Sequence, residues 1–385
     1  MPENLAPVVA VIGGGQLARM MAEPAAAMGI PLRLLAEAEG VSAAQVIPDQ
    51  LVGDYTDLDT LQKVTQGCAV VTFDHEHVPT DHLHALEKDL PVRPGPAALV
   101  HAQDKGVMRA RLAELDIPCP RNALVETTAD VIAFGFPCVL KTTRGGYDGK
   151  GVWFARTEAD AAEAFETAAS TGVQILAEEL VDFRRELSAL VARSPSGQVA
   201  AWPVVASTQQ DGVCREVIAP APDLQPGLAI EAQQIAMTLA AELDVTGVLA
   251  VELFETNDGR VLVNELAMRP HNTGHWTQDG SITSQFENHL RAVLDLPLGS
   301  PDARARWTVM VNILGGPGQT GRLYDGYPHA LARDPRLRVH LYGKGMRPGR
   351  KVGHVNAFGD DLDDCLERAR HAAAWFRGDL GEESE

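Results

Sequence analysis

The sequence lacks paired cysteine motifs, and it lacks a long apolar segment with a basic flank. Its five cysteines are odd in number and scattered, and none forms a C-x-x-C motif. Such cysteines are typical of reduced core residues in a cytosolic protein. The apolar run from Leu5 to Ile12 stops at three glycines. We therefore expect neither a signal peptide nor a membrane span, and we expect a cytoplasmic location.

Positive charge is also scarce. Lys and Arg number 33 against 52 Asp and Glu, which gives a net charge of −19. A field of that sign repels nucleic acid and anionic membranes, so neither is expected as a partner. A local cluster of cations in such a chain therefore favours a pocket for a small anion over a surface that binds a polyanion.

The 385 residues are too many for one simple core and suit two or three domains. Strand and helix alternate over the first hundred residues, which predicts an open, doubly wound α/β sheet. Its elements are expected at 8–12, 16–28, 32–36, near 51 and at 68–73. A Pro-rich stretch at 91–100 closes this unit. A mixed α+β region follows, strand-rich from 173 to about 294 with one helix at 230–243, and the tail carries strands at 307–313 and 337–342.

A first glycine motif, Gly13-x-Gly15-x-x-Ala18, separates the first strand from the first helix. Its spacing lets backbone N–H groups and the positive end of the helix approach a phosphate. Glu37 follows about twenty residues later, where a dinucleotide-binding fold places its ribose-binding acid. On its own this pattern is consistent with a nicotinamide-dependent oxidoreductase. It is also consistent with a tight strand–helix turn that binds nothing.

A second glycine cluster, KTTRGGYDGKG at 141–151, lies between two predicted strands. Glycines let a loop fold closely over phosphates, and the lysines at both ends supply point charges for the phosphate oxygens. The cluster is not a P-loop, because no Gly-Lys-Ser/Thr opens a helix. A flexible hairpin tip would explain the glycines but not the lysines. The cluster therefore predicts phosphate binding.

Two glutamates are expected to face each other on a hairpin with strands at 249–255 and 261–266. If Asp258 and Gly259 form a two-residue turn, counting outward along both strands places Glu252 opposite Glu265. Like charges in facing positions repel each other. A divalent cation between them relieves that repulsion, so the pair predicts a Mg²⁺ site beside phosphates.

The alternative is a solvated sheet face, which the apolar neighbours oppose. By alternation, the residues expected on the face of the two glutamates are Val248, Ala250, Phe254, Val261 and Val263. The expected pairing depends on the length of the turn, because a shift of one residue would break it.

Two further segments carry clustered polar groups. Donors are dense from Arg269 to Trp276, which is suited to gripping a small oxyanion, although a structural loop would look the same. Lys344, Arg347, Arg350 and Lys351 place four cations in eight residues. They predict a pocket for a phosphorylated substrate, with a solvated Pro-Gly turn as the alternative.

The histidines of DHEH at 74–77, with His82 and His84, are residues of the type that binds metals, but their spacing does not predict a zinc site. His75 and His77 are expected on a strand-like stretch. His82 and His84 cannot share a helix face.

Taken in order, these segments resemble the N5-carboxyaminoimidazole ribonucleotide synthetase family of the ATP-grasp superfamily. The resemblance covers nearly the whole chain, and several of its motifs are specific to this family rather than to the superfamily. They are GGGQLARM at 13–20, TFDHEHVP at 72–79, KTTRGGYDGKG at 141–151, AEELVDFRRELS at 177–188, NELAMRPHNTGHW at 264–276 and YGKGMRPGRKVGH at 342–354.

The resemblance implies an ATP-grasp fold in three domains. A Rossmann-like pre-ATP-grasp domain would span 1–103 and the ATP-grasp domain 104–300. The latter would divide into a smaller, lid-bearing part at 104–172 and a larger part at 173–300. A small strand-rich domain at 301–385 would complete the substrate site.

The resemblance also implies a reaction in purine biosynthesis. ATP would phosphorylate bicarbonate, and the 5-amino group of aminoimidazole ribonucleotide would capture the activated carboxyl. The products would be the N5-carboxy compound, ADP and phosphate. Mg²⁺, or alternatively Mn²⁺, would assist, and a homodimer is expected.

Roles carry over to this sequence by position. ATP phosphates would meet Lys105, Lys141 and the loop residues Gly146, Tyr147, Asp148, Gly149, Lys150, Gly151 and Val152. Adenine would meet the backbone of Glu178, Glu179, Leu180 and Val181, and the ribose would meet Glu186. The metal would be held by Glu252 and Glu265, with Asn264 adjacent. Bicarbonate and carboxyphosphate would be positioned by Tyr147, Arg269, His271 and Asn272. The nucleotide substrate would be bound by Gly15, Gln16, Leu17, Glu76, Lys344, Arg350 and Lys351.

The sequence departs from the family pattern at a few positions. Gln209 stands near the ATP site where the family commonly has histidine, Asp74 replaces a glutamate and Thr273 a serine. None of these changes removes a group that the chemistry needs. Other ATP-grasp ligases remain the nearest alternative, such as a formate-dependent glycinamide ribonucleotide transformylase. An oxidoreductase would leave the glutamate pair unexplained, and a silent ATP-binding regulator would not need it.

Overall fold

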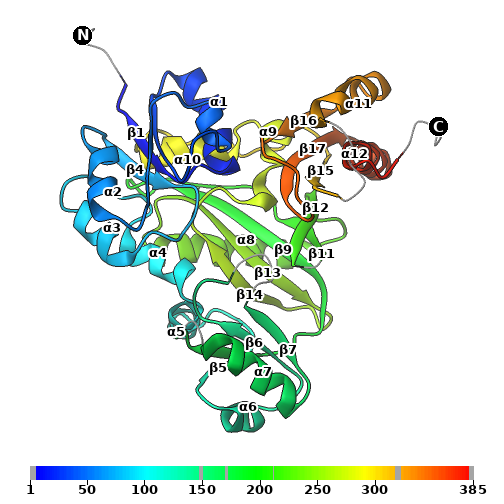
Figure 1. Ribbon diagram of the computed structural model, residues 1–385. Helices are drawn as coiled ribbons and strands as arrows, with labels where there is room; N and C mark the ends of the chain where they lie inside the picture. Colours follow the sequence, from blue (N-terminus) through cyan, green and yellow to red (C-terminus); the bar gives the residue numbers. More distant parts are fainter. Residues whose placement is uncertain (1–5, 147–150, 170–171, 211, 317–321, 381–385) are drawn as a thin grey trace.

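The computed structural model describes residues 6–146, 151–169, 172–210, 212–316 and 322–380 (Figure 1). Three sheets organise this part of the chain. The expected ATP-grasp architecture, with an α/β unit in front and strands in the tail, is confirmed. None of the helices in these ranges combines the length and apolar character that a bilayer crossing requires.

The N-terminal unit is the predicted doubly wound sheet. Its four parallel strands lie in the order β3-β2-β1-β4. They are β1 Val9–Ile12, β2 Leu32–Ala36, β3 Gln50–Val52 and β4 Val70–Phe73. The helical segments are α1 Gln16–Met28, η1 Ala43–Gln45, α2 Leu58–Thr65, α3 Thr80–Leu86 and α4 Pro96–Gln103. The Pro-rich stretch therefore contains a helix that was not predicted, and it begins with proline at a position where a missing N–H costs nothing.

A smaller lobe carries the second glycine cluster (lower part of Figure 1). Its antiparallel strands lie in the order β5-β8-β6-β7. They are β5 Asn122–Val125, β6 Cys138–Thr142, β7 Val152–Ala155 and β8 Ile175–Glu179. The helices are α5 Lys105–Glu114, α6 Thr128–Phe134 and α7 Glu158–Ala169. The glycine cluster therefore connects β6 to β7, as predicted.

The third sheet has nine strands and passes without a break from the middle of the chain into the tail. Its order is β14-β13-β9-β11-β12-β15-β17-β16, and β10 pairs with β9. The strands are β9 Phe183–Arg193, β10 Val199–Ala201, β11 Val205–Gln210, β12 Val213–Ala219, β13 Gly247–Thr256, β14 Val261–Ala267, β15 Trp307–Leu314, β16 Arg338–Leu341 and β17 Lys351–Gly359. Strands β12 and β15 are hydrogen-bonded across the domain boundary expected near residue 300, from Glu216 opposite Val311 to Ala219 opposite Thr308. The boundary itself stays a prediction.

Five helices and two 3₁₀ segments complete the described fold. They are α8 Pro226–Glu242, η2 Asn272–Gly274, α9 Thr277–Gly280, α10 Gln285–Val293, η3 Leu323–Gly326, α11 Tyr327–Arg333 and α12 Leu362–Arg377. The sequence indicated the helix at 230–243, which corresponds to α8, but it did not indicate helix α10. The burial of polar residues on α10 explains why the helix was not predicted. Asn288 and His289 are fully buried, so the core-facing side of this helix is not marked by apolar residues alone.

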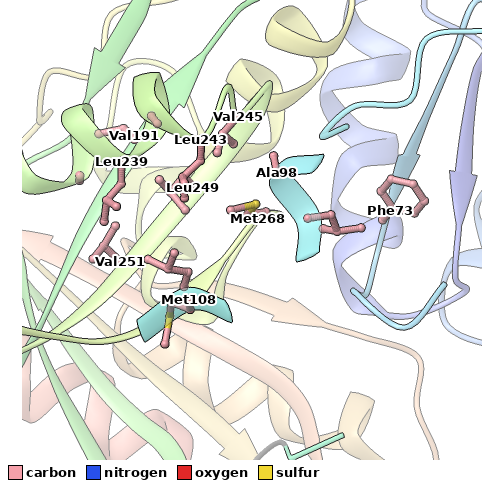
Figure 2. Close-up of a cluster of buried hydrophobic side chains, with 14 of the residues drawn as sticks. Phe73, Ala98, Met108, Val191, Leu239, Leu243, Val245, Leu249, Val251 and Met268 are labelled. Carbon is pink, nitrogen blue, oxygen red and sulfur yellow. The ribbon is translucent and has the colours of Figure 1, made fainter. Parts of the chain in front are cut away.

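One apolar core joins the N-terminal unit to the large sheet (Figure 2). Phe73 from β4 and Ala98 from α4 belong to the same buried cluster as Met108 from α5. Leu249 and Val251 on β13 continue it under helix α8. Burial of this apolar surface fixes the units against one another, because separating them would expose it to water.

His289 on α10 adds a polar link between the same two units. Its Nδ1 accepts from the backbone N–H of Val248, 3.1 Å away, so its Nε2 carries the proton and donates to Thr72 Oγ1 at 2.7 Å. Burial lowers the pKa of His289 from 6.5 to about 3. The folded protein therefore keeps this ring neutral where the unfolded chain would protonate it.

This link predicts an acid sensitivity. Between pH 6.5 and pH 3 the unfolded chain binds a proton at His289 that the folded chain refuses, so the free energy of unfolding falls as the pH falls. In His289→Gln the amide can replace the hydrogen bond of one ring nitrogen, and it does not titrate, so only the pH dependence of stability is compared. The loss of stability between pH 6 and pH 5, measured by urea unfolding, should be smaller than in the parent by about 1 kcal/mol. His84→Gln on the surface of α3 is the control, and an equal loss in parent and His289→Gln would contradict the prediction.

Candidate active site

A cavity of about 1200 Å³ lies where the N-terminal unit, the smaller lobe, the large sheet and the tail meet. Most of the residues singled out from the sequence line it. They are Gly15, Gln16, Leu17, Glu76, Lys105, Lys141, Gly146, Gly151, Val152, Glu178, Glu179, Leu180, Val181, Glu186, Gln209, Glu252, Asn264, Glu265, Arg269, His271, Asn272, Lys344 and Lys351. Tyr147, Asp148, Gly149 and Lys150 lie outside the described residues. Among the described ones, Arg350 is absent from the wall.

The hairpin of β13 and β14 places Glu252 directly opposite Glu265, as predicted. The route to this pairing differs from the expected one. Thr256 N–H donates to Arg260 O at 2.9 Å, so the turn has three residues instead of two. A bulge between the Glu252 and Leu253 pairs then inserts Asn264 into β14 and restores the pairing. Two departures from the expected ladder cancel.

The bulge also corrects the expected faces of the hairpin. Val261 and Val263 pair with Glu255 and Leu253, so they do not share the face of the two glutamates. They belong instead to the core under α8. The burial that the sequence pattern indicated is real, but on this strand it lies on the opposite face.

Glu252 is the carboxylate of the pair whose pKa is raised by this arrangement. About a quarter of its side chain is exposed, to the cavity. Burial raises its pKa to about 8, with further contributions from the negative charges of Glu265 and Glu186. Glu186, which lies on the neighbouring strand opposite Phe254, has its own pKa raised to about 7 by burial. The positive charge around these two carboxylates is too small to offset the cost of burying their ionised forms.

Cations from the smaller lobe approach the hairpin from one side. Lys105 Nζ lies 2.9 Å from Glu265 Oε1. Lys141 Nζ lies 3.1 Å from Asn264 Oδ1 and 2.6 Å from Glu178 Oε2. Both lysines therefore lie beside the glutamate pair. Their positive charges would complement the negative charges of a nucleotide's phosphates at this place.

Arg269 and Glu76 form an ion pair on the other side. Arg269 Nε lies 2.8 Å from Glu76 Oε2, while Glu76 Oε1 accepts from the Met268 N–H at 3.0 Å. Burial would lower the pKa of Arg269, but the charges of Glu76, Asp74 and Glu265 raise it above its usual value. Arg269 is therefore a fixed cation at the cavity wall.

His271 and Asn272 complete this side of the wall. His271 Nε2 lies 3.2 Å from Glu252 Oε1, and its Nδ1 lies 2.9 Å from Thr273 Oγ1. Burial, with the positive charges of Arg269 and Lys351, holds the pKa of His271 well below its usual value, so the ring is neutral. Asn272 lines the cavity, and its Oδ1 is buried with no hydrogen-bond partner within the described part of the chain.

The first glycine motif is already engaged by the chain's own carboxylates. Asp74 Oδ2 accepts from the Gly15 N–H at 2.6 Å and its Oδ1 from the Ala18 N–H at 3.0 Å. Glu37, the acid that a dinucleotide would require, accepts from the Gly14 N–H at 3.0 Å. Burial raises the pKa of Asp74 to about 6. A phosphate at this helix end would therefore compete with Asp74 for the amides.

The basic tail reaches the cavity with two of its cations. Lys344 and Lys351 are on the wall, and Lys344 Nζ donates to Gln16 Oε1. Burial lowers the pKa of Lys344, an effect opposed by the charge of Asp74. Arg350 instead donates to the carbonyl of Gly345 at 3.2 Å. Its predicted contact with the substrate stays a prediction.

His75 and His77 of the histidine-rich segment lie in the loop after β4. No group of three or more His, Cys, Asp or Glu side chains able to hold a metal occurs within the described ranges. The strand-like assignment of His75 and His77 was wrong, because β4 ends at Phe73 and the two rings stack in the loop that follows. Burial lowers the pKa of His75 to about 4.

Arg109 on α5 is a buried cation beside the site that the sequence did not indicate. Its exposed fraction is 2%, and its Nε lies 2.6 Å from Glu178 Oε1. Burial alone would raise the pKa of Glu178, but Arg109 and Lys141 lower it. Arginine on a helix with other charged residues gives no periodic signal, so the sequence offered no reason to single it out.

Three family models match the chain in the order of its structural units. The Ribonucleotide synthetase preATP-grasp domain matches residues 7–103. The ATP-grasp domain matches residues 110–286, and the Phosphoribosylaminoimidazole carboxylase C-terminal domain matches residues 308–368.

Individual proteins match over nearly the full length. N5-carboxyaminoimidazole ribonucleotide synthase of Mycobacterium tuberculosis is 55% identical over 378 residues, which cover 97% of this chain and 88% of that protein. A crystal structure of the ADP complex of N5-carboxyaminoimidazole ribonucleotide synthetase has a TM-score of 0.88 at 36% identity, covering 99% of this chain and 100% of the other. The Aspergillus clavatus enzyme in complex with ADP and 5-aminoimidazole ribonucleotide has a TM-score of 0.88 at 30% identity, covering 97% and 99%. The chain belongs to the N5-carboxyaminoimidazole ribonucleotide synthase family, whose members are ATP-grasp ligases.

Proposed function

We propose that this chain carboxylates the 5-amino group of 5-aminoimidazole ribonucleotide with ATP and bicarbonate, through carboxyphosphate, in purine biosynthesis. One observation supports this most directly: a single cavity holds a carboxylate pair, lysines from the smaller lobe and lysines from the tail. Three reactants can thus meet at one place. The related crystal structures that contain ADP and 5-aminoimidazole ribonucleotide agree with this assignment.

ATP would lie between the smaller lobe and the large sheet. Lys105 and Lys141 would neutralise its phosphates, and the backbone of 178–181 would meet the adenine. Glu186 faces the same cavity and suits the ribose, since a carboxyl group with a pKa of about 7 can donate or accept a hydrogen bond near neutral pH. Gln209 lines the wall nearby. The role of the loop residues 147–150 stays a prediction from the resemblance.

The glutamate pair fits Mg²⁺, with Mn²⁺ as the alternative. Two facing carboxylates, one with a pKa raised to about 8, are what a divalent cation would relieve. Mg²⁺ in phosphoryl-transfer sites is commonly bound by one or two carboxylates together with phosphates and water, so a larger protein ligand set is not required. When bound, the ion would neutralise charge on the transferring phosphoryl group.

Bicarbonate would bind beside the pair, against Arg269, His271 and Asn272. Arg269 supplies a fixed positive charge, and its ion pair with Glu76 holds its orientation. Because His271 is neutral, it can hydrogen-bond the oxyanion without adding charge. The unpartnered Asn272 Oδ1 could accept from the bicarbonate hydroxyl. These residues therefore orient the anion toward the phosphate and shield it from water.

The nucleotide substrate would enter from the side of the tail. Lys344 and Lys351 would meet its phosphate near Gln16 and Leu17. Asp74 holds the amides of Gly15 and Ala18, so the lysine side chains would carry most of the phosphate contact. The first glycine motif thereby acts as a tight turn that shapes this end of the cavity.

The expected domain division at 103 and 300, the homodimer and the cytoplasmic location belong to the same proposal. They rest on the resemblance and on the sequence rather than on the geometry of the cavity.

The decisive experiment measures ADP release by the purified chain in the presence of Mg²⁺ and bicarbonate. Adding 5-aminoimidazole ribonucleotide should raise the rate strongly and yield one carboxylated product per ADP. Formate with glycinamide ribonucleotide is the comparison that tests the nearest alternative ligase. Turnover with that pair, and none with bicarbonate, would replace the proposed reaction.

The metal assignment predicts the behaviour of Glu265→Gln. The substitution keeps the shape but removes one of two charges that hold Mg²⁺, so turnover should fall by about two orders of magnitude or more. The lost ion pair with Lys105 is offset by relief of the repulsion with Glu252, so the free energy of unfolding should stay within about 1 kcal/mol of the parent. Glu114→Gln is the matched control, because it breaks an ion pair with Arg111 on the surface of α5. Near-normal activity in folded Glu265→Gln would sink the assignment.

The nucleotide assignment predicts a selective defect in Lys344→Ala. Loss of a charged hydrogen bond should weaken binding of 5-aminoimidazole ribonucleotide by about 1.5–3 kcal/mol and leave ATP affinity nearly unchanged. Calorimetric titration with each ligand separates the two. Arg350→Ala, measured alongside, tests whether that residue joins the contact. Equal losses for both ligands would indicate a general disturbance of the cavity instead.

A further inference from the structure

The bulge at Asn264 in β14 leaves a backbone carbonyl that needs a hydrogen-bond donor from outside the ladder. A bulged residue has no partner in the ladder, and an unpaired buried carbonyl is costly. In this chain Arg109 NH2 donates to the carbonyl of the bulged Asn264 at 2.7 Å, and its NH1 donates to the carbonyl of the preceding residue, Val263, at 2.9 Å. The N–H of Val263 is satisfied by Pro118 O at 2.8 Å. The free edge of the large sheet is thus fastened to α5 and the loop after it.

The same guanidinium closes a ring of contacts. Arg109 Nε binds Glu178, Glu178 binds Lys141 Nζ at 2.6 Å, and Lys141 Nζ binds Asn264 Oδ1 at 3.1 Å. Asn264 then returns to Arg109 through its carbonyl. Arg109 and Glu178 are each 2% exposed, so the ring is shielded from solvent on that side and its geometry is tightly held.

Helix α5 sets this arrangement from one face. Asp104 caps the helix by accepting from the N–H groups of Gly106 and Val107. Lys105 and Arg109 are four residues apart and project from the same side. Lys105 reaches Glu265 while Arg109 holds the backbone just before it. One helical turn therefore grips both the side chain and the main chain of the segment that carries the proposed metal ligand.

We propose that Arg109 is a positioning residue for the ATP and metal site: it fixes the bulge at Asn264, so that Glu265 faces Glu252, and through Glu178 it fixes Lys141. This inference rests on the proposed function of the cavity. Arg109 itself lies behind the wall and touches no reactant. Its planar fork is suited to the task, because it reaches a carboxylate and two carbonyls at once, which the single ammonium of lysine does not.

The test compares Arg109→Lys and Arg109→Met with Arg111→Met. Arg111 lies on the same helix but pairs with Glu114 on the surface, so it controls for changes to α5. Binding of the non-hydrolysable analogue AMP-PNP with MgCl₂ is measured by calorimetry, and 5-aminoimidazole ribonucleotide is titrated separately. We expect about tenfold to hundredfold weaker analogue binding in both Arg109 variants, and a change of less than about twofold for the ribonucleotide. Arg111→Met should match the parent in both titrations.

Arg109→Lys keeps the charge beside Glu178 and therefore guards against loss of folding, which thermal unfolding checks in every variant. Analogue affinity equal to the parent in folded Arg109→Lys and Arg109→Met would overturn the positioning role and leave the ATP site intact. Equal weakening of both ligands, or failure of both variants to fold, would assign Arg109 to the fold alone and overturn the role as well. Failure of the parent to bind the analogue would overturn the proposed ATP site itself.

Discussion

The burial of Glu252 directly opposite Glu265 is the constraint around which the cavity is built. Two carboxylates face each other across a hairpin, and the pKa of Glu252 rises to about 8 because burial and the neighbouring charges disfavour its ionised form. Nothing in the hairpin itself offsets that cost. The offsetting charges come from other elements: Lys105 from α5, Arg269 from the segment after β14 and Lys351 from β17. The site therefore exists only when several distant segments of the chain are assembled.

The carboxylates around the cavity divide into two kinds by their surroundings. Glu178, Glu76 and Asp74 have short contacts to cations or backbone N–H groups, so their positions are determined by the protein. Glu252 and Glu186 have few such contacts, and their pKa values lie near 8 and 7. A group left without compensation in the free protein is one that a ligand can compensate. This difference separates the carboxylates that build the cavity from those that face its contents.

The sequence predicted the parts of this structure that depend on local pattern. The strand–helix alternation gave the first sheet, and the hairpin brought the two glutamates together as expected. The correct pairing, however, rested on a three-residue turn and a bulge at Asn264 that alternation cannot detect. Helix α10 was missed because its buried face contains histidine and asparagine, and Arg109 was missed because its partners are backbone carbonyls far away in the chain. Such features depend on tertiary contacts, which a single sequence does not display.

The occupied helix end at Asp74 shows how far local motifs can be trusted. The glycine spacing before α1 indicates a phosphate-binding turn. Two of its backbone amides, however, already donate hydrogen bonds to the carboxylate of Asp74. Burial keeps the pKa of that carboxylate near 6, so it is held less firmly as an anion than an exposed aspartate would be. The motif describes the shape of the turn correctly, but the partner of its amides is Asp74, a residue that follows β4 and is distant in the sequence.

The unbroken sheet that runs from β14 to β16 has a mechanical consequence. The glutamate pair and the lysines of the tail are attached to the same hydrogen-bonded sheet, and the apolar core under α8 ties the N-terminal unit to it. Three walls of the cavity thus behave as one stiff frame. The smaller lobe has a separate sheet, and it meets that frame through α5, which packs in the shared apolar core beside α4, and through hydrogen bonds to the edge of β14. The frame therefore fixes the placement of the glutamate pair relative to the tail lysines, whereas the placement of Lys105 and Lys141 depends on the contacts that the smaller lobe makes with the frame.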